Sequence, residues 1–442
     1  MKKCILSLIC ICCMIAAVSC QKTPESVNVL AGRDFLEGLV ETPFVPYEAP
    51  ERVKANEKRS GLNIFFDAAV TVPAASAYGI MEVRQVQYTE DDYLRLMEYF
   101  SPGTTWVNRP EQTKADMIRQ YYEIQNSDRF TESEKEEYES LLEAAKDAPE
   151  VALTTPFSIK QAVEQGRGYA WSTGDEGKPS ESFSFYSTTW NWQYMRVASA
   201  SVMQQDFLQP EYTESDALLL PDFAHDPLIS KDDAYAAARK LIEEMGLASD
   251  FAVYTAEKAI AYEGREPSTY GWQFIFTRTS NGLQAPFDFD GWATWKTSPQ
   301  PAYTAPWSRE MISIFVDPDG IYKCDVRGLS AETKVMYENV TLLPFDQLLE
   351  RIKKQLVYQH AYQEEGVTGQ MVTVSSITLG LSVINEKDKP GYGMLIPSWT
   401  VEYRFSYNED AFDYNFDTAT VFNAIDGSYI EPRASADMLG YG

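Results

Sequence analysis

The chain has 442 residues, and its 65 acidic side chains outnumber its 38 basic ones, which gives a formal net charge of −27. Apolar residues make up 44% of the sequence and aromatic residues 13%, which is typical of folded domains and excludes disorder for the bulk of the chain. Because a phosphate backbone requires a basic face, the acidic balance disfavours nucleic-acid binding.

The first 19 residues are typical of a secretory signal peptide. Lys2 and Lys3 precede an apolar run that is shorter than the roughly 20 residues needed to cross a bilayer. The run ends in Ala17-Val18-Ser19-Cys20, which resembles a bacterial lipobox, where the cysteine thiol carries a diacylglycerol. We therefore expect lipidation of Cys20 and anchoring at the extracytoplasmic face of the cell membrane. The alternative is an ordinary signal peptide that is cut elsewhere.

Cysteine usage predicts a protein without internal disulfides. Five of the six cysteines lie in the first 20 residues, so Cys324 is expected to be the only other thiol after processing. Cys324 lies in a strand-like run and neither histidine, His225 or His360, is near it in sequence. We expect Cys324 to be a packing residue and not a nucleophile.

Residues 20–58 carry several prolines among charged runs, and we expect them to form a lipidated tether. The stretch 59–222 is expected to form an N-terminal α+β domain. Its expected strands are 62–72, 80–88 and the aromatic-rich 183–203, and its expected helices are 90–100, 111–126 and 131–147. The Gly- and Ser-rich interval 164–182 is expected to be a loop.

The C-terminal half contains two units with the same order of elements, 227–330 and 331–432. Each unit begins with a helix, carries a tryptophan in its middle strand (Trp272 or Trp399), and ends in an Asp-Gly pair. Asp-Gly favours a hairpin turn because glycine readily adopts a positive φ. We therefore expect an α+β protein in which each C-terminal module packs one helix on an antiparallel sheet.

These modules resemble the PepSY-like modules of envelope regulators and other exported proteins of Gram-positive bacteria. The resemblance is carried by the alanine-spaced helix before the sheet, by Ile396-Pro397-Ser398-Trp399 and by the turn at 423–427. The layout from Cys20 through Tyr47-Glu48-Ala49-Pro50-Glu51 to the strand ended by Pro73 is similar to an uncharacterised lipoprotein family, a domain of unknown function, of gut Firmicutes. The resemblance implies location and fold, and it brings no catalytic residue.

Motifs of the common catalytic and cofactor chemistries are missing from the sequence. It has no Gly-x-Ser-x-Gly, no His-Glu-x-x-His, no phosphate-binding glycine loop and no zinc-type cysteine pair, so we assign no catalytic residue, cofactor or metal. Asp288 and Asp317 open stretches that look like calcium loops, but neither stretch has an acid at the twelfth position. A glycoside hydrolase needs only two carboxylates, and that alternative stays open.

A Pro-rich segment at 285–307, between two expected strands, concentrates aromatic side chains. They are Phe287, Phe289, Trp292, Trp295, Tyr303 and Trp307. Long insertion loops are often functional, and aromatic faces stack on sugars or are buried in protein interfaces. We treat this aromatic loop as a candidate ligand or partner site. The alternative is that the rings fold back over the sheet as core.

These observations predict a membrane-anchored, extracytoplasmic lipoprotein that is not an enzyme. Its expected partners are membrane lipid, through the diacylglycerol on Cys20, and an envelope protein bound by an interaction or regulatory module. The first alternative is a surface glycan-binding lipoprotein, in which the same rings stack on sugars. The second is a glycoside hydrolase that uses a carboxylate pair.

Overall fold

The computed structural model describes residues 36–431, with gaps at 60, 110, 127–134, 137, 152–153, 173–180, 188, 199, 205–224, 264–265, 288–302, 361–367, 387–388 and 410–411. The described chain contains both helices and sheets, as an α+β protein does, but strands predominate and the architecture is mostly β. None of the described helices is both long and apolar enough to span a membrane. Cys20 lies outside the described residues.

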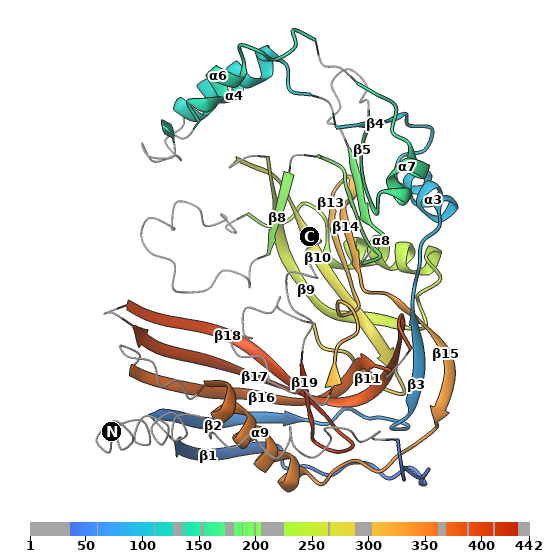
Figure 1. Cartoon of the computed structure of the whole chain (residues 1–442), viewed down its shortest axis with the longest axis vertical. Helices are drawn as coiled ribbons and strands as arrows, with labels where there is room; N and C mark the ends of the chain where they lie inside the picture. Colours follow the sequence, from blue (N-terminus) through green and yellow to red (C-terminus); the bar gives the residue numbers. More distant parts are fainter. Residues whose placement is uncertain are drawn as a thin grey trace, which may run out of the picture.

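One sheet, here called sheet A, gathers strands from both ends of the chain (Figure 1). Its main path runs β1-β2-β16-β17-β18-β19-β12, while β3 pairs with β17 and β15 pairs with β3. The β2–β16 and β12–β19 pairs are parallel, and the other pairs are antiparallel. The strands are β1 (Arg52–Arg59), β2 (Leu62–Thr71), β3 (Ile80–Gln85), β12 (Tyr303–Thr304), β15 (Ser330–Tyr337), β16 (Thr368–Asn385), β17 (Tyr392–Glu409), β18 (Phe412–Asn423) and β19 (Tyr429–Glu431).

The second sheet, sheet B, is antiparallel throughout and follows the order β4-β5-β6-β7-β14-β13-β10-β9-β8, with β11 paired to β10. Its strands are β4 (Trp106–Asn108), β5 (Arg167–Ser172), β6 (Ser182–Tyr186), β7 (Asn191–Met195), β8 (Ala200–Gln204), β9 (Phe251–Glu263), β10 (Glu266–Ser280), β11 (Leu283–Gln284), β13 (Met311–Asp317) and β14 (Gly320–Arg327). The sheets meet where β11 lies on β16, since a Cβ on Gly380 would be 2.4 Å from the Gln284 carbonyl oxygen.

Helices cover one face of each sheet (Figure 1). Helices α3 (Glu90–Phe100), α7 (Ile159–Glu164) and α8 (Lys231–Glu244) cover one face of sheet B, and α9 (Phe345–His360) covers the face of sheet A opposite β11. The pair α4 (Lys114–Gln125) and α6 (Ser140–Ala144) lies apart from both sheets. The expected helix at 90–100 and the helix expected in each C-terminal unit are confirmed as α3, α8 and α9, whereas the expected helix at 131–147 is described only from 135 and contains the short α6.

Local sequence explains where these helices begin. Thr89 and Asp92 form a capping box at the start of α3, and Thr113 and Asp116 form the same arrangement at α4. Each box satisfies backbone N–H groups that have no partner within the helix. The Ser230 hydroxyl accepts from the Asp233 backbone N–H and caps α8.

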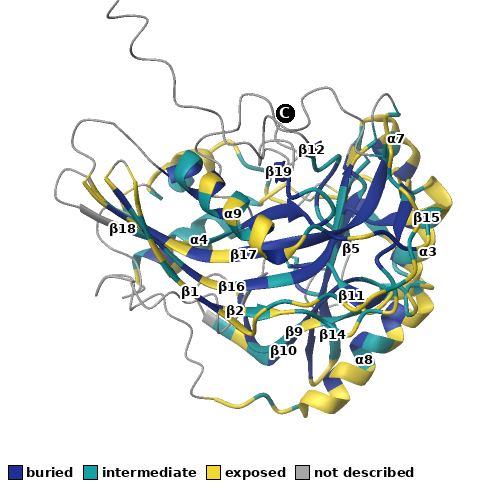
Figure 2. Ribbon diagram, turned by 90° about the horizontal axis from the view of Figure 1, so that it is seen from below, coloured by how far each residue is buried: buried dark blue, intermediate teal, exposed yellow. Residues whose placement is uncertain are grey.

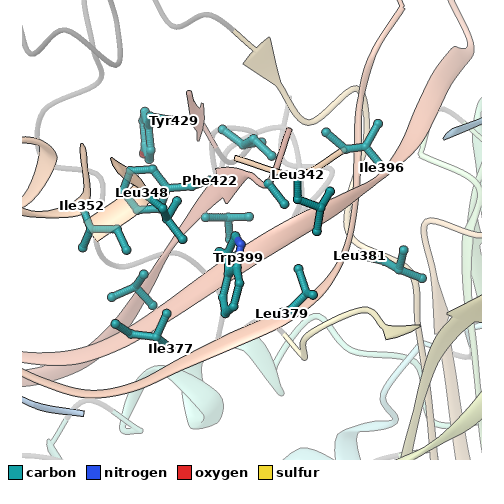
Figure 3. Packing of buried hydrophobic residues seen from close by; sticks show 14 of the residues in the cluster. Leu342, Leu348, Ile352, Ile377, Leu379, Leu381, Ile396, Trp399, Phe422 and Tyr429 are labelled. Carbon is teal, nitrogen blue, oxygen red and sulfur yellow. The ribbon is translucent and has the colours of Figure 1, made fainter. Parts of the chain in front are cut away.

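Each sheet has its own apolar core (Figure 2). The core of sheet A lies between the sheet and α9, where Trp399 and Phe422 meet Leu348 and Ile352 of the helix (Figure 3). The core of sheet B contains stacked rings, among them Tyr93 of α3 on Phe185 of β6, with ring centroids 3.9 Å apart. The β-structure expected at 183–203 is confirmed as β6, β7 and β8, and the structure adds that several of its rings belong to this core.

The two expected C-terminal units share one chain order in the structure. The series α8-β9-β10-β13-β14 matches α9-β16-β17-β18-β19, and in each series the four strands are neighbours in sequence order. Both Asp-Gly turns join the third and fourth strands. The rings beside the turns also match, since Phe315 contacts Tyr322 at 5.5 Å and Phe422 contacts Tyr429 at 6.3 Å between centroids.

The sheets do not follow the expected segment boundaries. The expected domain 59–222 is divided, because β2 and β3 pair within sheet A whereas β4 to β8 pair within sheet B. The physical reason is patterning: alternate residues of β2, from Leu62 to Ala68, are buried on the α9 side and extend the face of β16. Strand β7 likewise pairs with β14 and extends the first C-terminal unit.

The expectation of a free tether is wrong for residues 36–58. Strand β1 pairs along its whole length with β2, and the chain before it packs on the core of sheet A. The Tyr47 hydroxyl donates to the Leu343 carbonyl at 2.7 Å, and its ring lies 5.5 Å from that of Trp399. Aromatic side chains between the prolines attach this extended segment to the sheet.

Candidate functional site

The aromatic loop divides into buried and undescribed parts. Tyr303 and Trp307 are 8% and 3% exposed and belong to the core of sheet A. Phe287 is partly buried, with its ring centroid 6.5 Å from that of Tyr254. The other three rings, Phe289, Trp292 and Trp295, lie outside the described residues. For Tyr303 and Trp307, therefore, the alternative interpretation as core is the one that the structure supports.

A cavity of about 30 Å³ lies at the base of this loop. It is lined by Pro286, Trp307 and Glu310 on the side of the loop and by Leu381 and Ile430 of sheet A. This volume holds about one or two water molecules, so the cavity is too small for a sugar or a peptide.

The two ends of the loop are held together by a buried ion pair. Arg278, near the end of β10, is fully buried and its Nη2 donates to Glu310 Oε1 at 2.9 Å. Glu310 also accepts from the backbone N–H and the hydroxyl of Ser330, at 2.6 and 2.9 Å. Ser330 begins β15, so this cluster also connects sheet B with a strand of sheet A. We interpret it as a structural centre, because Arg278, Glu310 and Ser330 bind one another.

Among the described residues, a group of accessible aromatic side chains with polar neighbours lies on sheet B, on the face opposite α3 and α7. We call it the ring face and define it by Tyr169, Trp171 and Tyr186 with Arg109 and Gln193 beside them. Side chains alternate along a strand, so Gly168 and Ala170 of β5 point toward the helices while Tyr169 and Trp171 point away. Glycine is required at 168, because a Cβ there would lie 2.4 Å from the Phe185 ring.

The strand register arranges the ring face in rows. Tyr169 pairs with Ser184, Ser184 pairs with Gln193, and Gln193 pairs with Asp325 of β14. A second row runs from Trp171 through Ser182 and Met195 to Lys323. Arg167 pairs with Tyr186 at the end of the face. The rings and the residues in these rows therefore face the same side of sheet B, on which Met195 and Asp325 are buried.

The rings of this face contact one another and remain accessible. Tyr169 is 44% exposed, and Trp171 and Tyr186 are half-buried. The Tyr169 and Tyr186 rings meet edge to face at 5.8 Å, and their hydroxyls are hydrogen-bonded. Burial and the Tyr169 hydroxyl raise the pKa of Tyr186 to about 12, so its hydroxyl stays protonated and able to donate. The Arg109 guanidinium lies 5.4 Å from the centre of the Trp171 ring.

The remaining sequence candidates are structural. Asp317 accepts from the Thr269 hydroxyl and the Asp319 backbone N–H and forms an ion pair with Arg196, so its carboxylate supports the β13–β14 turn. Cys324 is fully buried, and burial raises the pKa of its thiol, which agrees with a packing role. Across the described part of the chain, no three His, Cys, Asp or Glu side chains gather as a metal site. Asp288 lies outside that part.

Sequence reasoning missed the ring face because the interval 164–182 was expected to be a loop. That expectation is wrong for β5, whose six residues form a strand between β4 and β6. The available signal was the alternation in Arg167-Gly168-Tyr169-Ala170-Trp171-Ser172, with small residues on one face and large ones on the other. The flanking glycines and serines obscured it.

Comparisons with known proteins leave the chain without a family. No family model matches the sequence, and no curated protein matches it. Among solved structures, the chain is similar to an uncharacterized protein from Eubacterium rectale, with 12% sequence identity and a TM-score of 0.41 over 86% of this chain and 93% of that one.

Proposed function

We propose that this chain is a membrane-anchored extracytoplasmic lipoprotein that binds glycan through the ring face. Two PepSY-like modules and an N-terminal segment provide the scaffold in this proposal, and the protein performs no catalysis. The observation that carries the binding role is the accessible cluster of Tyr169, Trp171 and Tyr186 at one side of this sheet face.

The chemistry of the ring face suits a sugar. Aromatic faces bury the apolar side of a pyranose, and Tyr and Trp do so while keeping a polar group available. Ser184 and Gln193 lie in the same row as Tyr169 and can bond sugar hydroxyls. Because the rings stand on paired strands, the surface is preorganised and little is lost in ordering it.

The sequence predicts an envelope-protein partner and a candidate site in the aromatic loop. As a binding surface, the ring face has more support than that loop. Two of the loop's six rings are core residues, whereas Tyr169 is exposed without being needed in either core. A glycoside hydrolase has less support, since the carboxylate on the ring face, Asp325, is already paired with Arg327 at 2.8 Å.

Ring-face variants test the binding role. We expect Tyr169→Ala and Trp171→Ala each to weaken glycan binding roughly 2- to 13-fold, the effect of losing about 0.5–1.5 kcal/mol of ring contact. The measurement is a glycan-array screen of the full chain, followed by calorimetry with the glycans retained. Tyr122→Ala is the matched control, because Tyr122 is 57% exposed on α4.

A loop replacement separates this proposal from the protein-partner alternative. Exchanging 288–302 for a Gly/Ser sequence of equal length should leave glycan binding unchanged while Tyr169→Ala weakens it. Loss of binding in the loop exchange, with Tyr169→Ala behaving as wild type, would move the site to the aromatic loop.

The anchoring part of the proposal depends on Cys20. In cell fractionation, the Cys20→Ala variant should leave the membrane fraction, because two acyl chains hold a protein at a membrane far more firmly than an acidic surface can. A variant that stays with the membrane to the wild-type extent would contradict lipidation at Cys20.

A further inference from the structure

The ring face carries cations that the protein leaves without an acidic partner. Arg167 pairs across strands with Tyr186, Arg109 lies over Trp171, and Lys323 ends the row that begins at Trp171. Among the described residues, no carboxylate oxygen lies within 4.0 Å of these three side chains. Such an arrangement stands out in a chain whose net charge is −27.

The acid that shares this face is neutralised by its neighbour. The Nη2 and Nε groups of Arg327 donate to the two carboxylate oxygens of Asp325, at 2.8 and 3.3 Å. Because Arg327 takes up the charge of Asp325, the remaining charge of the face is positive. A positive patch on an acidic protein favours an anionic ligand locally and repels anions elsewhere.

The environment of Lys323 favours the binding of an anion. It is partly buried, and burial lowers the pKa of its ammonium group although Asp325 acts in the opposite direction. Removing a charge from water without a counter-charge costs free energy, and a bound anion would recover part of that cost. Lys323 lies three strands from Trp171, or about 14 Å at the usual strand spacing, which is the reach of a short oligosaccharide.

We propose that the ligand of the ring face is an anionic polysaccharide whose rings stack on Tyr169 and Trp171 while a carboxylate or sulfate group binds Lys323. Arg109 and Arg167 would contact further anionic groups along the same chain. This inference rests on the proposed glycan-binding function and adds the charge of the glycan to it.

The test compares matched charged and neutral glycans on the full chain by isothermal titration calorimetry. The pairs are polygalacturonate with its methyl ester, and dextran sulfate with dextran. We expect at least one anionic member to bind 10-fold or more tightly than its neutral partner, with an affinity that falls as salt rises. Lys323→Gln should reduce the anionic affinity toward the neutral value and leave the neutral affinity unchanged.

Two further variants keep the test decisive. Arg109→Gln changes an exposed side chain and should lower the anionic affinity even if Lys323→Gln folds poorly. Lys334→Gln removes an exposed lysine from β15 and should change nothing. Equal binding of both members of each pair would overturn the anionic inference and leave the glycan proposal standing. Binding of neither member, or binding of polyglutamate alone, would overturn both.

Discussion

At the scale of single residues, His360 is a titratable group that the fold holds in a defined state. It ends α9, its Nε2 lies 2.8 Å from the Tyr403 hydroxyl, and its ring is 4.3 Å from that of Phe405. Burial in this aromatic pocket lowers the pKa of His360 from 6.5 to about 3. The folded protein therefore keeps the imidazole neutral at any pH near physiological.

Because His360 is buried in its neutral form, the free energy of unfolding depends on pH. Between pH 6.5 and about 3 the unfolded chain binds a proton at His360 that the folded chain does not bind. Stability must therefore fall as pH decreases through that window, by about 1.4 kcal/mol per pH unit from this group. We expect His360→Gln to remove this slope, as measured by urea unfolding at several pH values.

The measurement takes the difference in stability between wild type and His360→Gln at each pH, because buried acids contribute a pH dependence of the opposite sign. Burial raises the pKa of Asp426 and Glu431, so the folded state holds their protons more firmly than the unfolded state does. Both contributions are common to the two proteins and cancel in the difference. Parallel pH profiles for wild type and His360→Gln would show that His360 is protonated in the folded protein.

At the scale of elements, helices and strands were predicted best where the hydrophobic pattern of a segment agrees with the capping or turn residues at its ends. The helix at 90–100 and the strand at 62–72 match α3 and β2, because the first has a capping box and the second alternates buried apolar residues with more exposed ones before Pro73. The repeated units were visible because an Asp-Gly turn and a central tryptophan occur in both copies. Trp272 and Gly320 are 48 positions apart whereas Trp399 and Gly427 are 28 apart, so the aromatic loop is an insertion into one copy.

Elements whose stability comes from distant partners were not predictable. Strand β5 contains a glycine, Gly168, and ends in Ser172, and pairing with its neighbours β4 and β6 makes it a strand. The segment before β1 is extended and proline-rich like a linker, and contacts with residues far along the chain, among them Asn339, Leu343 and Trp399, hold it in place. Single-sequence patterns describe local preference, and both of these segments depend on long-range pairing. The ring face was missed for the same reason.

At the scale of the whole molecule, the chain passes between the two sheets several times. Both sheets take strands from the N-terminal and C-terminal halves, so neither sheet is a contiguous piece of sequence. The Arg278–Glu310 pair lies at one of these crossings, where β15 leaves the vicinity of sheet B to join β3. A buried ion pair adds little to stability over an apolar pair, but the loss of one partner is costly.

Breaking this pair should therefore destabilise the entire molecule. We expect Glu310→Gln to lower the free energy of unfolding by roughly 1–3 kcal/mol, since the buried Arg278 guanidinium loses its nearest counter-charge and keeps the more distant carboxylates of Asp250 and Glu332, 3.7 and 3.8 Å from Nη1. The double change Arg278→Met with Glu310→Leu should recover part of the loss, because it removes both charges. Urea unfolding followed by tryptophan fluorescence measures these differences in both cores, which contain Trp399 and Trp192.

The exposed ion pair of Arg52 with Asp67, 2.6 Å long, is the matched control, and Asp67→Asn should leave stability unchanged because solvent screens that pair. If Glu310→Gln were as stable as Asp67→Asn, the crossing between the sheets would be held by apolar packing alone. If only one core unfolded earlier in Glu310→Gln, the pair would stabilise that sheet and not the connection. We expect both cores to lose stability together because Ser330 binds both members of the pair. Its carbonyl accepts a hydrogen bond from Arg278, and its backbone N–H donates one to Glu310.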